Sequence, residues 1–199
     1  MDLEIREIKK VDASLVAILH HKMFKNFFLT SLGTNFLTFF YSTIIESKNS
    51  IGIIIFSDQK LIGFAIGNTR NSDFYKNIVF DNFVGYAFQI LGLIFTRPLS
   101  IFRIIRNLFF SAHHNMNNLP CLLSICSYSK SSCSGIGKKL IYEYEAKLKS
   151  GNWTEYFLAT DARNNDSVNE FYKKCGFNKV LVIKQSSKRQ LNIYHKTLI

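Results

Sequence analysis

The stretch "SSCSGIGKKL" (residues 131–140) places two glycines between an apolar run and a run with helical spacing. Spacing excludes two common phosphate-binding loops. A P-loop requires a glycine where Ser132 stands and a serine or threonine where Lys139 stands, and a dinucleotide fingerprint requires a third glycine at Leu140. What remains is a strand, a loop of small residues and a helix that begins near Gly135.

The start of that helix is a candidate anion site. The first amide N–H groups of a helix have no partner within the helix, and they attract negative charge. Glycine at positions 135 and 137 also lets an anion approach the backbone where a Cβ atom would block it. The spacing therefore suits a pyrophosphate, but two glycines alone are equally typical of a tight strand-to-helix turn.

A second motif lies downstream in "NDSVNEFYKKCGF" (residues 165–177). Asn165 stands seven positions before Tyr172, and Gly176-Phe177 follow four and five positions after it. Together with the glycine loop, this pattern resembles the GCN5-related N-acetyltransferase (GNAT) family. The signature of that family is (Arg/Gln)-x-x-Gly-x-(Gly/Ala) after the fourth strand, followed by Asn-x-x-Ala-x-x-φ-Tyr-x-x-x-Gly-Phe, where φ is apolar.

The resemblance is specific over residues 120–180 and implies an acetyl-CoA site where the fourth strand splays from the fifth. The pantetheine arm would pair with backbone near Ile125 and Ser127, and Asn165 would contact that arm. The backbone amides implied to hold the pyrophosphate belong to Ser132, Cys133, Ser134, Gly135, Ile136, Gly137 and Lys138. The chain departs from the signature at Ser132, which leaves the backbone amide in place, and at Val168, a modest change in helix packing.

The chemistry implied by the resemblance needs few side chains. A neutral amine attacks the thioester carbonyl, a backbone N–H of the fourth strand polarises that carbonyl, and an acid protonates the departing thiolate. Tyr172 is the expected acid; otherwise it is a core aromatic of an amphipathic helix. No general base is assigned. Thr160 cannot serve, and Asp161 would face away from the site. The pair His113-His114 is equally typical of a surface loop.

The composition is that of one packed domain without low-complexity segments. The chain has 199 residues, of which 47% are hydrophobic and 15% aromatic, with two prolines. Its net charge of +11 is spread over interspersed lysines and arginines, which indicates a solvated basic surface and no nucleic-acid partner. Four cysteines without a CxxC pair indicate reduced thiols and no metal site. The charged N-terminal stretch lacks a signal peptide, so we expect a cytoplasmic protein.

Apolar periodicity predicts strands that alternate with helices, an α/β (α+β) fold with a mixed, mostly antiparallel central sheet flanked by helices. A first strand precedes a helix that Asp12 would cap, and Thr30, Ser31 or Thr34 would cap a second helix. The predicted strands span residues 3–8, 51–56, 61–67, 121–128, 155–160, 179–183 and 191–198, and the predicted helices span residues 13–23, 30–47, 137–150 and 166–175.

Residues 70–118 form an insertion between the third and fourth strands that the GNAT pattern does not require. The run from Asn82 to Thr96 is uncharged, and the pair Arg97-Pro98 would end one apolar helix and begin another. The run is too short to span a membrane. Three roles remain open: a lid over the acceptor, a dimer contact, or an amphipathic hairpin on a membrane surface. As a lid, its arginines at 97, 103 and 106 would engage an anionic acceptor group.

The sequence therefore predicts an acetyl-CoA-dependent N-acetyltransferase that acts on a small amine. The second helical stretch (residues 28–41), "FLTSLGTNFLTFFY", resembles that of bacterial family members linked to surface-polysaccharide pathways, which implies an amino-sugar acceptor by analogy. The alternative is a non-catalytic module of the same fold that binds a membrane surface or a protein partner through the apolar hairpin at 79–110.

Overall fold

The computed structural model describes residues 3–25, 27–70, 74–96, 118–128, 135–186 and 189–198. Within these ranges the chain forms one seven-stranded sheet in the order β1-β2-β3-β4-β5-β7-β6. The strands are β1 (Leu3–Glu7), β2 (Ser50–Ser57), β3 (Lys60–Asn68), β4 (Cys121–Ser127), β5 (Glu155–Asp161), β6 (Asn178–Lys184) and β7 (Gln190–Thr197). The α-helices are α1 (Ala13–Met23), α2 (Thr34–Glu46), α3 (Phe74–Asp81), α4 (Phe83–Thr96), α6 (Ile136–Ser150) and α7 (Asp166–Lys174).

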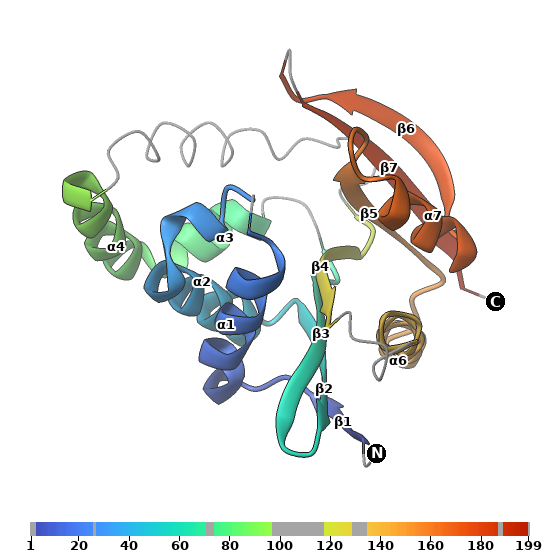
Figure 1. Cartoon of the computed structure of the whole chain (residues 1–199), viewed down its shortest axis with the longest axis horizontal. Helices are drawn as coiled ribbons and strands as arrows, with labels where there is room; N and C mark the ends of the chain where they lie inside the picture. Colours follow the sequence, from blue (N-terminus) through green and yellow to red (C-terminus); the bar gives the residue numbers. More distant parts are fainter. Residues whose placement is uncertain are drawn as a thin grey trace.

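The sheet is antiparallel except at its centre, where β4 and β5 run parallel. Helices α1, α2 and α3 cover one face, and α6 lies on the opposite face (Figure 1). Each face has its own apolar core. One core joins α1 and α2 to β2 and β3, and the other joins α6 and α7 to β5 and β7. The predicted fold class and the predicted order of strands and helices are confirmed.

The hairpin of β2 and β3 supplies the most deeply buried strands. Each is a nearly continuous apolar run, as expected for strands covered on both faces. The turn between them uses Asp58 and Gln59, whose φ angles are 48° and 62°. Two successive positive φ angles give the turn the twist of the strands that it joins.

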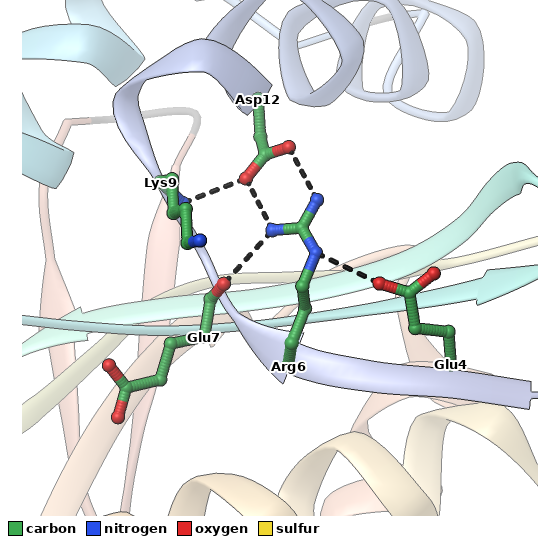
Figure 2. Close-up of polar contacts among 5 residues, drawn as sticks. All are labelled: Glu4, Arg6, Glu7, Lys9 and Asp12. Atoms are coloured by element: carbon green, nitrogen blue, oxygen red, sulfur yellow. Dashed lines mark hydrogen bonds and ion pairs between the residues drawn. The ribbon is translucent and has the colours of Figure 1, made fainter.

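Arg6 of β1 and Asp12, directly before α1, tie the first strand to the first helix (Figure 2). The guanidinium donates from Nη1 to Asp12 Oδ2 and from Nη2 to Asp12 Oδ1, both at 2.8 Å. The Lys9 amide also donates to Asp12 Oδ2 at 2.8 Å. Asp12 stands at the N-cap position of α1, as expected, but its carboxylate makes no capping hydrogen bond, because Arg6 and the Lys9 amide occupy it.

The start of α2 also differs from the expectation. Its N-cap is Gly33, with a φ of 91°, and no side chain caps the helix. The hydroxyl of Thr30 donates instead to the carbonyl oxygen of Phe24, at 2.5 Å, and that of Ser31 to the carbonyl oxygen of Phe28, at 2.6 Å. Hydroxyls at such positions can serve the preceding turn as well as the helix. They stabilise the connection between α1 and α2.

The insertion between β3 and β4 begins with α3 and α4, two helices where one was expected before Arg97. Tyr86 of α4 is buried against the rings of Phe36 and Phe39 of α2, and its hydroxyl lies 2.8 Å from that of Thr43. The part of the insertion from residue 97 to residue 117, including the expected break at Arg97-Pro98, lies outside the described residues. Among the described residues, no helix is both long and apolar enough to cross a membrane.

Candidate functional site

The expected divergence of the fourth and fifth strands is present at the centre of the sheet (Figure 1). β4 and β5 are in register only at Cys121–Phe157 and Leu122–Leu158. Beyond these pairs, residues 123–125 in the middle of β4 are half-exposed, although β4 is a central strand. We call the opening beside these residues the β4–β5 gap. It leaves an edge of backbone that another extended group can pair with.

One hydrogen bond at the end of β4 shows which edge of the strand each backbone N–H and C=O group faces. The amide of Tyr128 donates to the carbonyl oxygen of Ile62 on β3, at 2.8 Å. Antiparallel pairing alternates, so the flanking positions Ile125 and Ser127 turn their N–H and C=O groups to the opposite edge. These groups therefore face the β4–β5 gap.

A β-bulge reverses the side-chain alternation inside β4. The register against β3 shifts between Ile66, which faces Ser124, and Gly67, which faces Leu122. Leu123 is the extra residue, and a bulge re-aims the side chains beside it. Leu123 and Ser124 consequently both turn toward α1 and α2, where Leu123 packs in the core and Ser124 receives a hydrogen bond from Tyr41.

Helix α6 starts beside the carboxyl end of β4. Its N-cap Gly135 has a φ of 87°, a left-handed conformation that favours glycine, and a Cβ atom there would meet nothing within 4 Å. The first helical bond runs from the Lys139 amide to the Gly135 carbonyl. The amides of Ile136, Gly137 and Lys138 therefore have no partner within the helix.

Gly137 has a different reason to be glycine. A Cβ atom at this position would lie 3.1 Å and 3.2 Å from two ring atoms of Phe171 on α7, and 3.7 Å from Ser127 Oγ. The second glycine thus allows α6 and α7 to approach closely beside β4. The other predicted loop residues, Ser132, Cys133 and Ser134, lie outside the described residues.

Tyr172 of α7 is 6% exposed and lies between the rings of Phe171, Phe177 and Tyr194. Within the described part of the chain, no hydrogen-bond partner is present for its hydroxyl. Burial raises the pKa of the phenol well above its usual value of 10. Tyr172 is therefore a neutral hydrogen-bond donor at neutral pH.

Asn165 stands at the N-cap of α7. Its Nδ2 donates to Thr160 Oγ1 at 2.9 Å and to the carbonyl oxygen of Asp161 at 3.1 Å, which holds the start of α7 against the end of β5. Asn169, one turn later, donates to the same carbonyl and accepts from Asn192 and Tyr194 of β7. These amides fix the position of α7, and with it the position of Tyr172.

The base candidates considered from sequence are engaged or not described. Asp161 pairs with Arg189, at 2.7 Å from its Nε, and Thr160 accepts from Asn165. The pair His113-His114 lies outside the described residues.

One histidine was missed. His20 of α1 is 4% exposed, and its Nδ1 lies 2.7 Å from Tyr41 Oη, which donates to Ser124 Oγ at 3.3 Å. These residues lie on α1, α2 and β4, at separations of 21 and 83 positions, so no sequence motif connects them.

A basic hollow of about 490 Å³ opens between the end of α1 and the start of α2. The Lys22 ammonium at its rim lies 4.7 Å from the centre of the Tyr128 ring, directly after β4. The described residues that line the hollow are Ile18, His21, Lys22, Lys25, Thr30, Ser31 and Thr34, and none of them is acidic. This lining suits an anionic group near the carboxyl end of β4.

No family model matches the chain, and no curated protein matches it in sequence. Solved structures match it over nearly its full length. An acetyltransferase of the GNAT family from Streptococcus pneumoniae is 17% identical, with a TM-score of 0.59 and 99% of each chain covered. Aminoglycoside 6'-acetyltransferase type Ii is 14% identical, with a TM-score of 0.64 and 98% of this chain and 97% of that chain covered.

The ribosomal-protein-S18-alanine N-acetyltransferase from Escherichia coli is 11% identical, with a TM-score of 0.61 and 99% of this chain and 94% of that chain covered. The acceptors in these names range from an antibiotic to a protein, so the likeness identifies a fold and no acceptor. The splayed central strands, the glycine turn into α6 and these matches together show that the chain has the fold of the GNAT acetyltransferases.

Proposed function

We propose that the protein is an acetyl-CoA-dependent N-acetyltransferase that acts on a small amine. The observation that carries this proposal is the β4–β5 gap, a half-exposed edge of a central strand that leads directly to the start of α6. The backbone of Ile125 and Ser127 would pair with the pantetheine arm. The amides of Ile136, Gly137 and Lys138, which have no partner within α6, would bind the pyrophosphate.

Acetyl-CoA supplies an activated acyl group as a thioester. In the transfer, the amine nitrogen bonds to the acyl carbon, the carbon–sulfur bond breaks, and the thiolate takes one proton while the amine loses one. The hydroxyl of Tyr172 is the proposed donor to the thiolate. It is neutral, held by α7 packing, and without a partner among the described residues. The amine proton leaves to solvent in this scheme.

For the acceptor, we propose an amine that carries an anionic group, with an amino sugar as the narrower proposal. The basic hollow of His21, Lys22 and Lys25 lies beside the end of β4 and supports this choice. The expected arginine contacts of the insertion fall outside the described residues.

Calorimetry with acetyl-CoA, followed by a thiol-release screen of amines, tests the proposal. We expect micromolar binding and release of CoA with one class of amine. Charge reversal at Lys22 and Lys25 should raise the acceptor KM and leave acetyl-CoA affinity unchanged. A folded protein that does not bind acetyl-CoA would contradict the proposed function.

A second candidate function, attachment to a membrane surface, is favoured by one feature of α4. Phe83, Val84 and Phe88 of this helix are 65%, 66% and 70% exposed. Such a run of exposed apolar side chains is unusual on a monomer surface, and the protein is basic overall. Attachment and acetyl transfer are compatible, because α4 and the β4–β5 gap lie on different parts of the molecule (Figure 1).

A further inference from the structure

The buried chain of His20, Tyr41 and Ser124 has no role in the scheme above. Its last member lies in the half-exposed middle of β4, at the β-bulge and beside the β4–β5 gap. Its first member is buried, and His20 Nε2 is a polar atom without a partner among the described residues. An unsatisfied buried nitrogen costs free energy, so its retention indicates a use for the imidazole.

The direction of the hydrogen bonds that join His20, Tyr41 and Ser124 follows from counting protons. Tyr41 has one hydroxyl proton, and the geometry gives it to Ser124 Oγ. Tyr41 Oη must then accept from His20, so the proton of the neutral imidazole sits on Nδ1 and Nε2 carries the lone pair. Ser124 Oγ accepts from Tyr41, so its own proton points elsewhere. No acceptor for that proton is present in the described part of the chain.

We propose that the Ser124 hydroxyl donates a hydrogen bond to the thioester carbonyl oxygen of the acyl donor, and that Tyr41 and His20 are positioning residues that aim this donor into the β4–β5 gap. The inference rests on the proposed acetyl transfer. Negative charge develops on the carbonyl oxygen as the amine adds, and a fixed donor stabilises this charge more than a rotating one. Ser124 lies on the same side of the sheet as Cys126, two positions further along β4, and the β-bulge places Leu123 on that side as well.

The surroundings keep the side chains of His20, Tyr41 and Ser124 neutral over the working pH range. Burial lowers the pKa of His20 to about 4. Tyr41 is faced by Cys126 of β4 and Tyr75 of α3, and burial raises the pKa of both groups far above neutral. His21 on α1 is the remaining titratable neighbour of His20, and its side chain is exposed. A neutral, buried chain suits a fixed donor and does not suit a base that must take up a proton.

Kinetic measurements on variants test the proposed roles of Ser124 and Tyr41 against a matched control. Ser124→Ala should lower kcat by roughly 100-fold with unchanged acetyl-CoA affinity, the effect of losing one donor to a developing oxyanion. Tyr41→Phe should lower kcat by about 10-fold, because the Ser124 hydroxyl remains but is no longer oriented. The control is Tyr86→Phe, which removes another buried tyrosine hydroxyl, bonded to Thr43 of α2 at 2.8 Å, and should leave kcat unchanged.

Two variants of His20 distinguish a role as hydrogen-bond donor from a role as general base. The Nδ2 of an asparagine can replace the Nδ1–H of histidine but cannot take up a proton, whereas leucine can do neither. We expect His20→Asn to retain most of the wild-type kcat and His20→Leu to fall to the level of Tyr41→Phe. Equal loss in both variants, or a kcat profile that follows the ionisation of His20 between pH 5 and pH 9, would overturn the assigned direction of the chain.

A measurement on the free protein adds a readout other than activity. In ¹⁵N-histidine-labelled protein, with His20 identified by its loss in His20→Asn, we expect a protonated Nδ1 and an unprotonated Nε2 from pH 5.5 to pH 8.5. A proton on Nε2 overturns the inference. Failure of the wild type to bind acetyl-CoA overturns the proposed function together with this role. An active wild type with undiminished kcat in Ser124→Ala overturns the role of Ser124 alone.

Discussion

Tyr172 combines burial with an unused hydroxyl, and this combination leads to a kinetic prediction. Tyr172→Phe keeps the ring in its place between Phe171 and Tyr194 and removes only the donor. We expect kcat to fall by about 10- to 1,000-fold, with little change in acetyl-CoA affinity, as for loss of a general acid. Steady-state kinetics and calorimetry check this. An unchanged kcat would mean that Tyr172 serves only the core.

Asp12 makes the free energy of unfolding depend on pH in the acidic range. The hydrogen bonds from Arg6 outweigh burial and hold the pKa of this carboxyl below its usual value of about 4. Its stabilisation is therefore complete above that value and is lost as the pH falls through the lower, folded-state pKa. Asp12→Asn should lower the free energy of unfolding at pH 7 by about 1.5–3 kcal/mol.

Urea unfolding of the wild type and Asp12→Asn at pH 7 and pH 3 measures this dependence. The difference between the two proteins should shrink at pH 3, because this pH lies below the usual carboxyl pKa, so that unfolding of the wild type takes up a proton at Asp12. A difference that is independent of pH would show that the side-chain shape matters and the charge does not. Lys10→Ala is a suitable control, because the Lys10–Glu46 ion pair is exposed at both ends and contributes little.

The two glycines of the α6 turn should respond differently to the same substitution. Gly135→Ala forces a left-handed residue to carry a Cβ, a cost of about 1–2 kcal/mol. Gly137→Ala has ordinary helical geometry but presses on Phe171, a cost of about 1–3 kcal/mol. A double-mutant cycle with Phe171→Leu distinguishes them. The smaller side chain should relieve Gly137→Ala and leave Gly135→Ala unchanged, and equal coupling would contradict this assignment.

Packing between α4 and α2 divides α4 into two faces with different expected effects. Tyr86→Ala should cost about 3 kcal/mol, because Tyr86 fills the contact with Phe36 and Phe39. The double variant Phe83→Ser/Phe88→Ser changes exposed positions and should shift the free energy of unfolding by less than about 0.5 kcal/mol.

The same double variant tests membrane attachment. We expect the wild type to sediment with vesicles that contain anionic lipid and the variant to remain in solution, because the apolar side chains of α4 would insert below the headgroups. Tyr142→Ser on α6 is the matched control, since Tyr142 is 70% exposed on another helix. A wild type that stays in solution with these vesicles contradicts the second candidate function.

The sheet as a unit has one weak seam, where β4 and β5 share only two registered pairs. A ligand bound in this seam contacts both halves of the fold and binds the folded state only. Acetyl-CoA at 100 times its dissociation constant should therefore raise the free energy of unfolding by about 2.7 kcal/mol. Thermal unfolding with and without the ligand measures this. Gly135→Glu, which places a carboxylate at the start of α6, should remain folded and lose the effect.

Most of the fold follows from local patterns in the sequence. The strand and helix periods, the hairpin of β2 and β3, and the two short motifs at 131–140 and 165–177 predicted the order of elements and the GNAT-like sheet. These patterns are local, because side-chain period and turn chemistry depend on neighbouring residues. For the same reason the N-cap residue of α2 was predicted wrongly, and Asp12, the predicted N-cap residue of α1, makes no capping hydrogen bond. The carboxylate of Asp12 binds Arg6, and the hydroxyl of Thr30 binds the turn before α2, although the local rule assigned both groups to helix caps.

The features that build the candidate site depend on contacts between distant segments. The β-bulge that places Leu123 on the same side of the sheet as Ser124 is a property of the pairing of β4 with β3, and the packing of Gly137 on Phe171 requires α6 and α7 to be adjacent. The chain from His20 through Tyr41 to Ser124 joins residues far apart in the sequence. Local spacing specified which elements form, whereas strand register and helix packing specified which side chains meet, because these depend on the shape of the assembled core.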